Sequence, residues 1–222
     1  MNIGREMGKI VTDLILEHKP KTMLEFGSYI GYSTVLFAST LKKAGGQEYV
    51  SFERDAKFAK VAQGFVELAG LSDVVRFVVG SSSKNIVAQV DAKKLTSVDM
   101  IFFDHYKPAY VRDLKICESL GLVKKNTVLA ADNVITPGNP TYLDYVRSSV
   151  ADKKKAFAEQ GGDSKGVDPR FPERTAKQYK DYEEDETVLP GDPDLIYDSR
   201  LAPGHEPTGE EDGVEITVCN GK

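Results

Sequence analysis

The chain has 222 residues, of which 41% are hydrophobic and 28% charged, so it can bury the core of one large α/β domain. Its formal net charge of -5 argues against nucleic acid as the main partner. No apolar run approaches the roughly 18 residues of a membrane span, and the amino-terminal residues lack the pattern of a signal peptide. Two cysteines, Cys117 and Cys219, are too few for a disulfide framework or a thiolate metal site. We therefore predict a cytoplasmic protein without a membrane partner.

Residues 22–34 predict a strand, a tight glycine turn and the start of a helix. A helix over residues 6–18 comes first, and Pro20 ends it. The turn has the form E-x-G-x-x-x-G, from Glu25 through Gly27 to Gly31, which is neither a dinucleotide fingerprint nor a phosphate loop. Glycine lets the backbone approach a ligand closely, and the free N–H groups of the helix start favour a carboxylate or phosphate. Because an acid before the turn would repel phosphate and suit an amine, S-adenosylmethionine fits better than NAD. An ordinary turn without a ligand is the alternative.

The next elements continue the alternation of strands and helices. The helix after the turn ends near Lys43, and a second strand over 48–52 is followed by Glu53. An acid at the end of the second strand of a doubly wound sheet is where the hydroxyls of a ribose are accepted. A capping or surface acid is the alternative for Glu53. Residues 55–69 predict an amphipathic helix with apolar positions at Phe58, Val61, Ala62, Phe65, Val66 and Leu68. A third strand over 74–79 leads to serines that would cap a helix, although Ser82 and Ser83 lie where an adenine edge could be read.

Polar side chains follow two further strands at the point where each strand ends. The buried strand over 98–103 ends in Asp104, His105, Tyr106 and Lys107, and the strand over 127–131 ends in Asp132 and Asn133. With a helix over 110–120 between them, these strands belong to a parallel sheet with helices on both faces, where ligands bind at the carboxyl ends. The two aspartates and the asparagine would then meet, and such an oxygen-only set suits Mg²⁺. A single strand-end aspartate could instead cap a helix.

The last third of the chain is polar and acidic. Residues 151–212 hold 17 Asp and Glu against 9 Lys and Arg, and six of the ten prolines. A rigid loop over 134–140 and a short helix over 142–148 come before it, and residues 151–190 show no convincing period, so we expect a mobile or surface-packed insertion. Strands over 195–197 and 214–218 close the sheet, joined by an irregular loop with His205 and Glu206. The last strand can pair antiparallel at or near the sheet edge. We therefore expect one domain over residues 1–222 with an acidic insertion at about 151–190.

Four stretches resemble the catechol O-methyltransferases, which belong to the Rossmann-like methyltransferases that depend on S-adenosylmethionine. They are Leu24-Glu25-Phe26-Gly27-Ser28-Tyr29-Ile30-Gly31-Tyr32-Ser33, Phe103-Asp104-His105-Tyr106-Lys107, Ala131-Asp132-Asn133-Val134-Ile135-Thr136-Pro137-Gly138 and Tyr145-Val146-Arg147. The resemblance covers almost all of residues 1–150 and returns at Glu206 and over 212–218. It implies a doubly wound, mostly parallel sheet with an antiparallel last strand.

The resemblance also implies roles for particular residues. Lys107 would be the general base, with a solvated loop lysine as the alternative, and Glu206 would hold the second catechol hydroxyl. Mg²⁺ would be bound by Asp104, Asp132 and Asn133. The S-adenosylmethionine site would comprise Ile3, Glu25, Gly27, Tyr29, Tyr32, Ser33, Glu53, Ser82, Ser83, Asp104 and His105. Met1, Tyr106 and Pro137 would form the substrate wall.

The chain departs from this family at the substrate wall and beside the ribose acid. Tyr106 stands where the animal enzymes carry tryptophan, Arg54 replaces an apolar adenine contact, and the chain has no tryptophan. The family carries further helices ahead of the segment that matches residues 1–4, and a shallower wall without them would favour a larger vicinal-diol phenol of the caffeoyl or flavonoid type as an alternative substrate. An NAD-type oxidoreductase and a non-catalytic cofactor-binding interaction protein are further alternatives. We expect a small-molecule catechol substrate, and a monomer or weak homo-oligomer.

Overall fold

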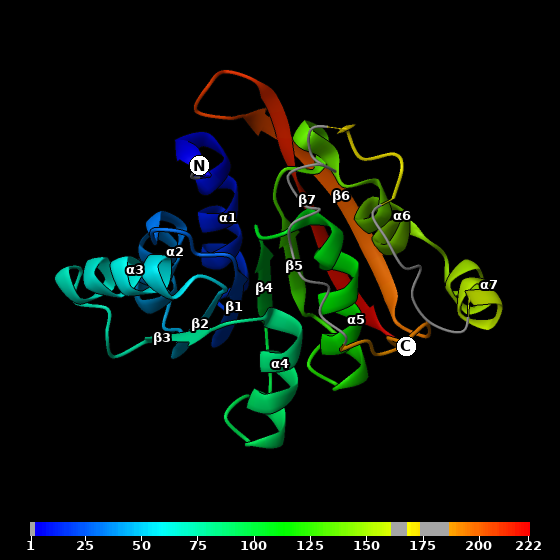
Figure 1. Cartoon of the computed structure of the whole chain (residues 1–222), viewed down its shortest axis with the longest axis horizontal. Coiled ribbons are helices and arrows are strands. Elements are labelled where there is room, and N and C mark those ends of the chain that lie inside the picture. Colours follow the sequence, from blue (N-terminus) through cyan, green and yellow to red (C-terminus); the bar gives the residue numbers. More distant parts are fainter. Residues whose placement is uncertain (1–2, 161–167, 174–186) are drawn as a thin grey trace.

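The computed structural model describes residues 3–160, 168–173 and 187–222. Its helices and strands alternate along most of the chain (Figure 1). The α-helices are α1 (Gly4–His18), α2 (Tyr32–Lys43), α3 (Ala56–Leu68), α4 (Ser82–Asp91), α5 (Tyr110–Ser119), α6 (Pro140–Arg147) and α7 (Val150–Gln160). The strands are β1 (Thr22–Phe26), β2 (Glu48–Glu53), β3 (Val75–Val79), β4 (Met100–Phe103), β5 (Val128–Ala131), β6 (Ile196–His205) and β7 (Glu211–Gly221). Short turns η1 (Lys107–Ala109) and η2 (Val134–Gly138) follow β4 and β5.

The strands form one seven-stranded sheet in the order β3-β2-β1-β4-β5-β7-β6. The first five of these pair in parallel, and β7 runs antiparallel to both β5 and β6. Phe26 at the end of β1 is level with Phe52 of β2 and with Phe103 of β4, which in turn is level with Ala131 of β5. Because these carboxyl ends are in register, the residues that follow them are delivered to one edge of the sheet. The predicted fold class is confirmed.

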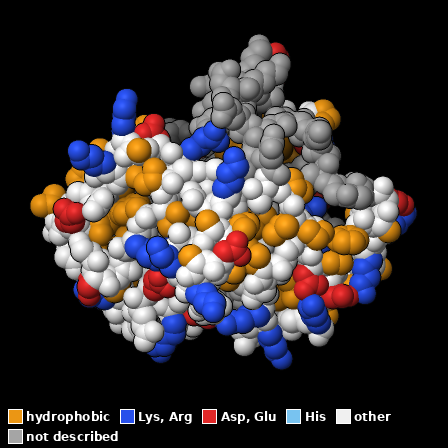
Figure 2. Space-filling model, turned by 60° about the horizontal axis from the view of Figure 1, so that its bottom comes forward, with side chains coloured by type: hydrophobic (Ala, Val, Ile, Leu, Met, Phe, Trp, Pro, Cys, Tyr) orange, Lys and Arg blue, Asp and Glu red, His pale blue; other side chains and the backbone are white. Residues whose placement is uncertain are grey.

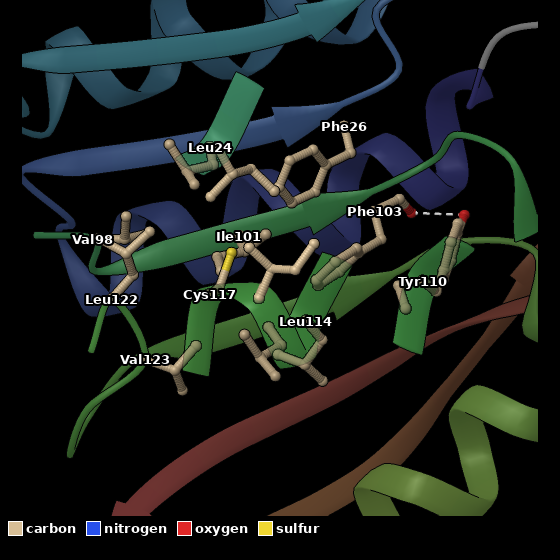
Figure 3. Packing of buried hydrophobic residues seen from close by; sticks show 14 of the residues in the cluster. Leu24, Phe26, Val98, Ile101, Phe103, Tyr110, Leu114, Cys117, Leu122 and Val123 are labelled. Atoms are coloured by element: carbon tan, nitrogen blue, oxygen red, sulfur yellow. Dashed lines mark hydrogen bonds between the residues drawn. The ribbon is translucent and has the colours of Figure 1, made fainter. Parts of the chain in front are cut away.

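Alternating strand residues supply the core on both faces of the sheet. Ile101 and Phe103 pack with residues of α4, α5 and α6, whereas Met100 and Phe102 pack with residues of α1, α2 and α3. Figure 3 shows the first of these layers, in which the Tyr110 hydroxyl donates to the Phe103 carbonyl oxygen over 2.9 Å. This alternation is the period-two pattern of a strand buried on both sides.

Helix α3 does not bury the apolar face that its sequence predicts. Its buried residues are the small Ala59 and Ala62 together with Val66. Phe58, Val61, Phe65 and Leu68 are exposed. The 3.6-residue period is present, but two adjacent stripes of this helix are apolar, and the stripe with the smaller side chains faces the protein.

The structure corrects two expectations for the last third of the chain. The stretch for which we expected no regular structure begins with helix α7. Its sequence shows no apolar period because the residue that it buries is Lys153, whose Nζ donates to the Leu195 carbonyl oxygen. Strand β6 continues to His205, so only residues 206–210 join it to β7. Since β6 is an edge strand with mostly exposed side chains, it lacks the apolar alternation by which a strand is recognised. Residues 161–167 and 174–186 of the expected insertion lie outside the described residues.

Among the described residues, none of the helices combines the length and the apolar character needed to cross a membrane. Both cysteines, Cys117 and Cys219, are buried and free.

Candidate active site

A pocket of about 350 Å³ lies at the carboxyl edge of the parallel strands. It brings together fifteen of the predicted site residues: Ile3, Gly27, Tyr29, Tyr32, Ser33, Glu53, Ser82, Asp104, His105, Tyr106, Lys107, Asp132, Asn133, Pro137 and Glu206. Glu25 and Ser83 are buried and do not line it, and Met1 lies outside the described residues. The pocket has a glycine-turn end, built by β1, β2 and α2, and an acidic end, built by the loops after β4 and β5.

Two glycines of the turn are needed for close packing beneath the pocket. A Cβ on Gly27 would lie 2.5 Å from the Asp104 carbonyl oxygen, and a Cβ on Gly31 would lie 2.8 Å from the Cβ of Ala62. Both residues have φ of +90°, a conformation that side chains disfavour. The turn can therefore pass directly under the β4 loop and onto α3 only as glycine. Tyr32 and Ser33 at the start of α2 line the pocket, and the N–H groups of this first helical turn have no partner within the helix.

Glu53 lies at the end of β2, where its carboxylate holds the turn. Its Oε2 accepts hydrogen bonds from the backbone N–H of Ser28 at 3.1 Å and of Tyr29 at 2.8 Å, and its Oε1 accepts one from Asp55 at 2.9 Å. This arrangement places a carboxylate on the wall of the pocket, in position to accept hydroxyl donors of a ligand.

Glu25 lies beneath the turn. Its Oε2 accepts hydrogen bonds from Thr34 Oγ1 at 2.6 Å and Ser51 Oγ at 2.7 Å, and burial raises its pKa to about 7. Since the carboxylate points to α2 and β2, the geometry favours a structural role. Direct contact between Glu25 and a cofactor remains a prediction, and the burial of Glu25 away from the pocket does not favour it.

A buried network joins His105 to the start of α4. His105 Nε2 donates to Asp113 Oδ2 over 2.9 Å, and the same carboxylate accepts a hydrogen bond from Ser82 Oγ. The His105 ring stacks on Tyr110, with centroids 5.0 Å apart and an interplanar angle of 9°. Asp113 therefore fixes the histidine tautomer with the proton on Nε2. Ser83 is buried, and its Oγ shares a hydrogen bond of 3.2 Å with Ser81 Oγ.

Lys107 is buried at the acidic end of the pocket. Its Nζ donates to Asn133 Oδ1 at 2.7 Å, Tyr110 OH at 2.8 Å and Asp104 Oδ1 at 3.0 Å. The ammonium group is thus held between the loops after β4 and β5. The alternative of a solvated loop lysine does not agree with this burial.

Asn133, Glu206 and Asp212 form a second set of contacts beside Lys107. The amide Nδ2 of Asn133 donates to Glu206 Oε1 and to Asp212 Oδ2, both at 2.8 Å. Burial raises the pKa of Glu206 to about 7, and the negative charge of Asp212 adds to this. The hairpin between β6 and β7 therefore brings a carboxylate from the far end of the chain to the residues that follow β5.

The acidic end has the character of a cation site. Burial first, and then the charge of Asp104, raise the pKa of the Asp132 carboxyl, and its buried Oδ1 lacks a hydrogen-bond partner among the described residues. Four carboxylates, those of Asp104, Asp132, Glu206 and Asp212, act on one another here. No group of three or more His, Cys, Asp or Glu in the described ranges has the arrangement of a metal site. The expected set is of another kind, with two carboxylates and one amide, and its oxygen donors and surplus negative charge fit a divalent cation.

Sequence reasoning missed three buried residues that hold the site in place. Asp212 accepts hydrogen bonds from the backbone N–H of Ile135 and Thr136, both at 3.1 Å, and Asn139 Nδ2 donates to the Lys107 carbonyl oxygen at 2.9 Å. Asp113 anchors His105 as described above. Asp113 is one of several charged residues of α5, so nothing in the sequence sets it apart, and its long-range partners cannot be read from the pattern.

The strand order and a glycine turn beneath a pocket at the carboxyl edge define the class of Rossmann-like methyltransferases. A family model described as O-methyltransferase matches residues 1–157, so the chain belongs to the O-methyltransferase family.

Catechol O-methyltransferase B of Danio rerio is 40% identical over 157 residues, which are 71% of this chain and 59% of that protein. Catechol O-methyltransferase of Bos taurus is 38% identical over 169 residues, covering 76% of this chain and 61% of that protein. The match thus spans about three fifths of the length of these curated relatives.

Solved structures agree on the fold. The O-methyltransferase TomG from Streptomyces achromogenes, in complex with SAM, superposes with a TM-score of 0.61 at 22% identity over 96% of this chain and 79% of that chain. The O-methyltransferase from Bacillus cereus, in complex with SAH, gives a TM-score of 0.60 at 23% identity over 95% of this chain and 80% of that chain. At these identities the likeness is one of fold alone.

Proposed function

We propose that this protein transfers a methyl group from S-adenosylmethionine to one hydroxyl of a small catechol, with Lys107 as general base and Mg²⁺ at Asp104, Asp132 and Asn133. The observation that carries the proposal is the placement of Lys107. Its buried Nζ contacts two of the three expected metal ligands, Asp104 and Asn133, in the same pocket as the glycine turn.

The glycine-turn end supports a cofactor with an adenosine and an amino acid part. Glu53 would accept the ribose hydroxyls, and Ser33 with the backbone near Ile3 would hold the methionine carboxylate at the start of α2. Ser82 and His105 would contact the adenine. These residues line one continuous pocket, so a ligand of this length can lie along it.

The acidic end supports a substrate with two adjacent hydroxyls. Mg²⁺ bound there would orient both oxygens and favour the deprotonated forms of the hydroxyl and of the neighbouring lysine. Glu206, whose carboxylate is 2.8 Å from Asn133 Nδ2, would accept a hydrogen bond from the hydroxyl that is not methylated. Tyr106 and Pro137 line the pocket beside it and would contact the aromatic ring.

The chemical step needs alignment more than covalent help from the protein. The oxygen attacks the methyl carbon, the bond from that carbon to sulfur breaks, and the hydroxyl proton passes to Lys107 Nζ. Holding oxygen, methyl and sulfur in line contributes roughly 7 to 11 kcal/mol in well-oriented systems. The two ends of the pocket, held by the registered strands β1, β2, β4 and β5, would supply that alignment.

The proposal is tested by changing Lys107 to Ala, and to Met, which keeps most of the apolar stem. Turnover should fall by about 10² to 10⁴-fold, the usual contribution of a general base, while the affinity for S-adenosylhomocysteine stays close to wild type in calorimetry. Retained turnover in a folded variant would refute Lys107 as the base. Loss of cofactor affinity along with turnover would instead assign Lys107 a role in holding the pocket.

We also propose that the protein is cytoplasmic. Two buried free cysteines are in keeping with a reducing cytoplasm.

A further inference from the structure

Helix α3 carries a stripe of large apolar side chains on its outer side, here called the α3 stripe: Phe58, Val61, Phe65 and Leu68. Their exposed fractions are 37%, 45%, 50% and 86%. The inner side of the same helix is made of Ala59, Ala62 and Val66. In Figure 1 α3 is the outermost helix at its end of the sheet, and Figure 2 shows hydrophobic side chains at that end of the molecule as well as across the middle of the visible face.

The spacing of the α3 stripe is that of a helix-pairing seam. Its residues follow one another at intervals of three, four and three, which places them on a single line of the helix, as the a and d positions of a heptad do. Scattered apolar residues on a surface need no explanation, but a continuous row of large ones marks an interaction site.

The charges beside the stripe favour an identical partner. Lys57 and Lys60 lie in the first half of α3, beside the capping Asp55, whereas Glu67 lies near its end; Asp73, just beyond the helix, is already paired with Lys42 Nζ at 2.8 Å and adds little. When two copies of this helix run antiparallel, the basic half of each faces the acidic half of the other, and a two-fold axis makes the contact self-complementary. A parallel pair would oppose like charges.

The middle of the stripe leaves room for close approach. Gly64 lies beside the line between Val61 and Phe65, and a Cβ built on it would meet nothing within 4 Å. Because helices can approach closely where a side chain is missing, the centre of α3 offers the contact point of a two-fold pair.

We propose that the α3 stripe is the interface of a homodimer, in which α3 packs antiparallel against α3 of a second copy of this chain about an axis near Gly64. The partner covers Phe65 and Leu68 with its own Val61 and Phe58.

The same contact reaches the mouth of the pocket. The ring of Phe58 lies 4.6 Å from that of Tyr29 in an edge-to-face arrangement, and both residues line the pocket. The neighbouring Ile30 and Tyr32 are also partly exposed and line the pocket. Dimer formation therefore adds apolar cover to the glycine-turn end, and this part of the inference rests on the proposed function of that end as the cofactor site.

Sedimentation velocity on the full chain, over protein concentrations from micromolar to hundreds of micromolar, tests the interface. We expect the wild type to sediment as a dimer at the upper end, and Phe65→Asp and Leu68→Asp to stay monomeric because each would bury a carboxylate in the seam. Leu16→Asp is the matched control, since Leu16 is 51% exposed on α1 and should leave the dimer intact. A wild type that stays monomeric throughout, or aspartate variants that still dimerise, would overturn the proposal.

Disulfide trapping tests the antiparallel arrangement. Gly64→Cys, near the axis, should link to its own copy on mild oxidation, whereas Glu67→Cys, away from the axis, should not. The native cysteines Cys117 and Cys219 are buried and should not interfere. If both variants link, the two helices are parallel, and if neither links, the interface lies elsewhere. Either result contradicts the proposed antiparallel pair. Neither experiment uses cofactor or substrate, so their outcome is independent of whether the protein transfers methyl groups.

Discussion

Glu25 shows how a single buried carboxyl can make stability depend on pH. Its pKa is raised from 4.5 to about 7 because it is fully buried beneath the glycine turn. A raised pKa means that the folded protein holds the proton more tightly than the unfolded chain does. The stabilisation is complete below pH 4.5 and is lost as the pH rises through about 7.

Replacing Glu25 by Gln should remove this dependence. A shift from 4.5 to about 7 corresponds to about 3 kcal/mol, so above pH 7 we expect Glu25→Gln to be more stable than wild type by up to that amount. The measurement is the free energy of unfolding in urea between pH 4.5 and pH 8, with the difference between the two proteins plotted against pH. A difference that does not change with pH would show that folding does not raise the pKa of Glu25.

Asp113 is a positioning residue for His105. Changing Asp113 to Asn removes the carboxylate that accepts from His105 Nε2 and Ser82 Oγ, which frees the ring to turn. We expect about a tenfold weaker affinity for S-adenosylhomocysteine, the worth of one ordinary hydrogen bond. Calorimetry measures it, and urea unfolding of the same variant shows that the protein remains folded. Equal affinities in wild type and Asp113→Asn would show that the histidine orientation does not matter for binding.

At the scale of elements, the loop after β5 depends on a carboxylate from β7. Asp212 accepts hydrogen bonds from the backbone N–H of Ile135 and Thr136 at 3.1 Å and from Asn133 Nδ2 at 2.8 Å. One side chain thereby fixes the start of η2 and the amide that faces Lys107. The last hairpin of the fold is thus part of the site, although it is far from it in sequence.

Asp212→Ala should therefore destabilise the fold and Asp212→Asn should mainly reduce activity. The alanine variant leaves several buried donors without an acceptor, at a cost of about 3 kcal/mol, measured by urea unfolding. The asparagine variant keeps Oδ1 for the backbone but turns a donor toward Asn133 Nδ2, so turnover should fall while the unfolding free energy changes less. Comparable stability of Asp212→Ala and wild type would contradict this account.

Features that depend on local sequence could be predicted, whereas features that depend on contacts between distant segments could not. The strands that end in Asp104 and in Asp132 were predictable because buried parallel strands are short apolar runs, and the rule for their carboxyl ends then brings the polar residues together. The inward face of α3 and the extent of β6 were not predictable, because a period shows that a face is apolar and not which neighbour covers it. The partners of Asp212 and Asp113 also depend on contacts between distant segments.

At the scale of the whole molecule, the register of the sheet explains why one pocket holds both a glycine turn and an acidic cluster. Phe26, Phe103 and Ala131 end their strands at the level of Phe52, one residue before the end of β2, and the residues that follow this level form the pocket walls. Membership of the O-methyltransferase family agrees with this arrangement. The proposed catechol acceptor depends on whether the enzyme requires two adjacent hydroxyls on its substrate.

The most direct test is methyl transfer from S-adenosylmethionine to a panel of catechols, larger vicinal-diol phenols and single-hydroxyl phenols, with Mg²⁺ and with EDTA, read by mass spectrometry. The account predicts product only from vicinal diols and only with the metal, because both adjacent oxygens must be held at the acidic end of the pocket. Product from single-hydroxyl phenols, product in EDTA, or no product with any acceptor despite measurable cofactor binding would contradict it.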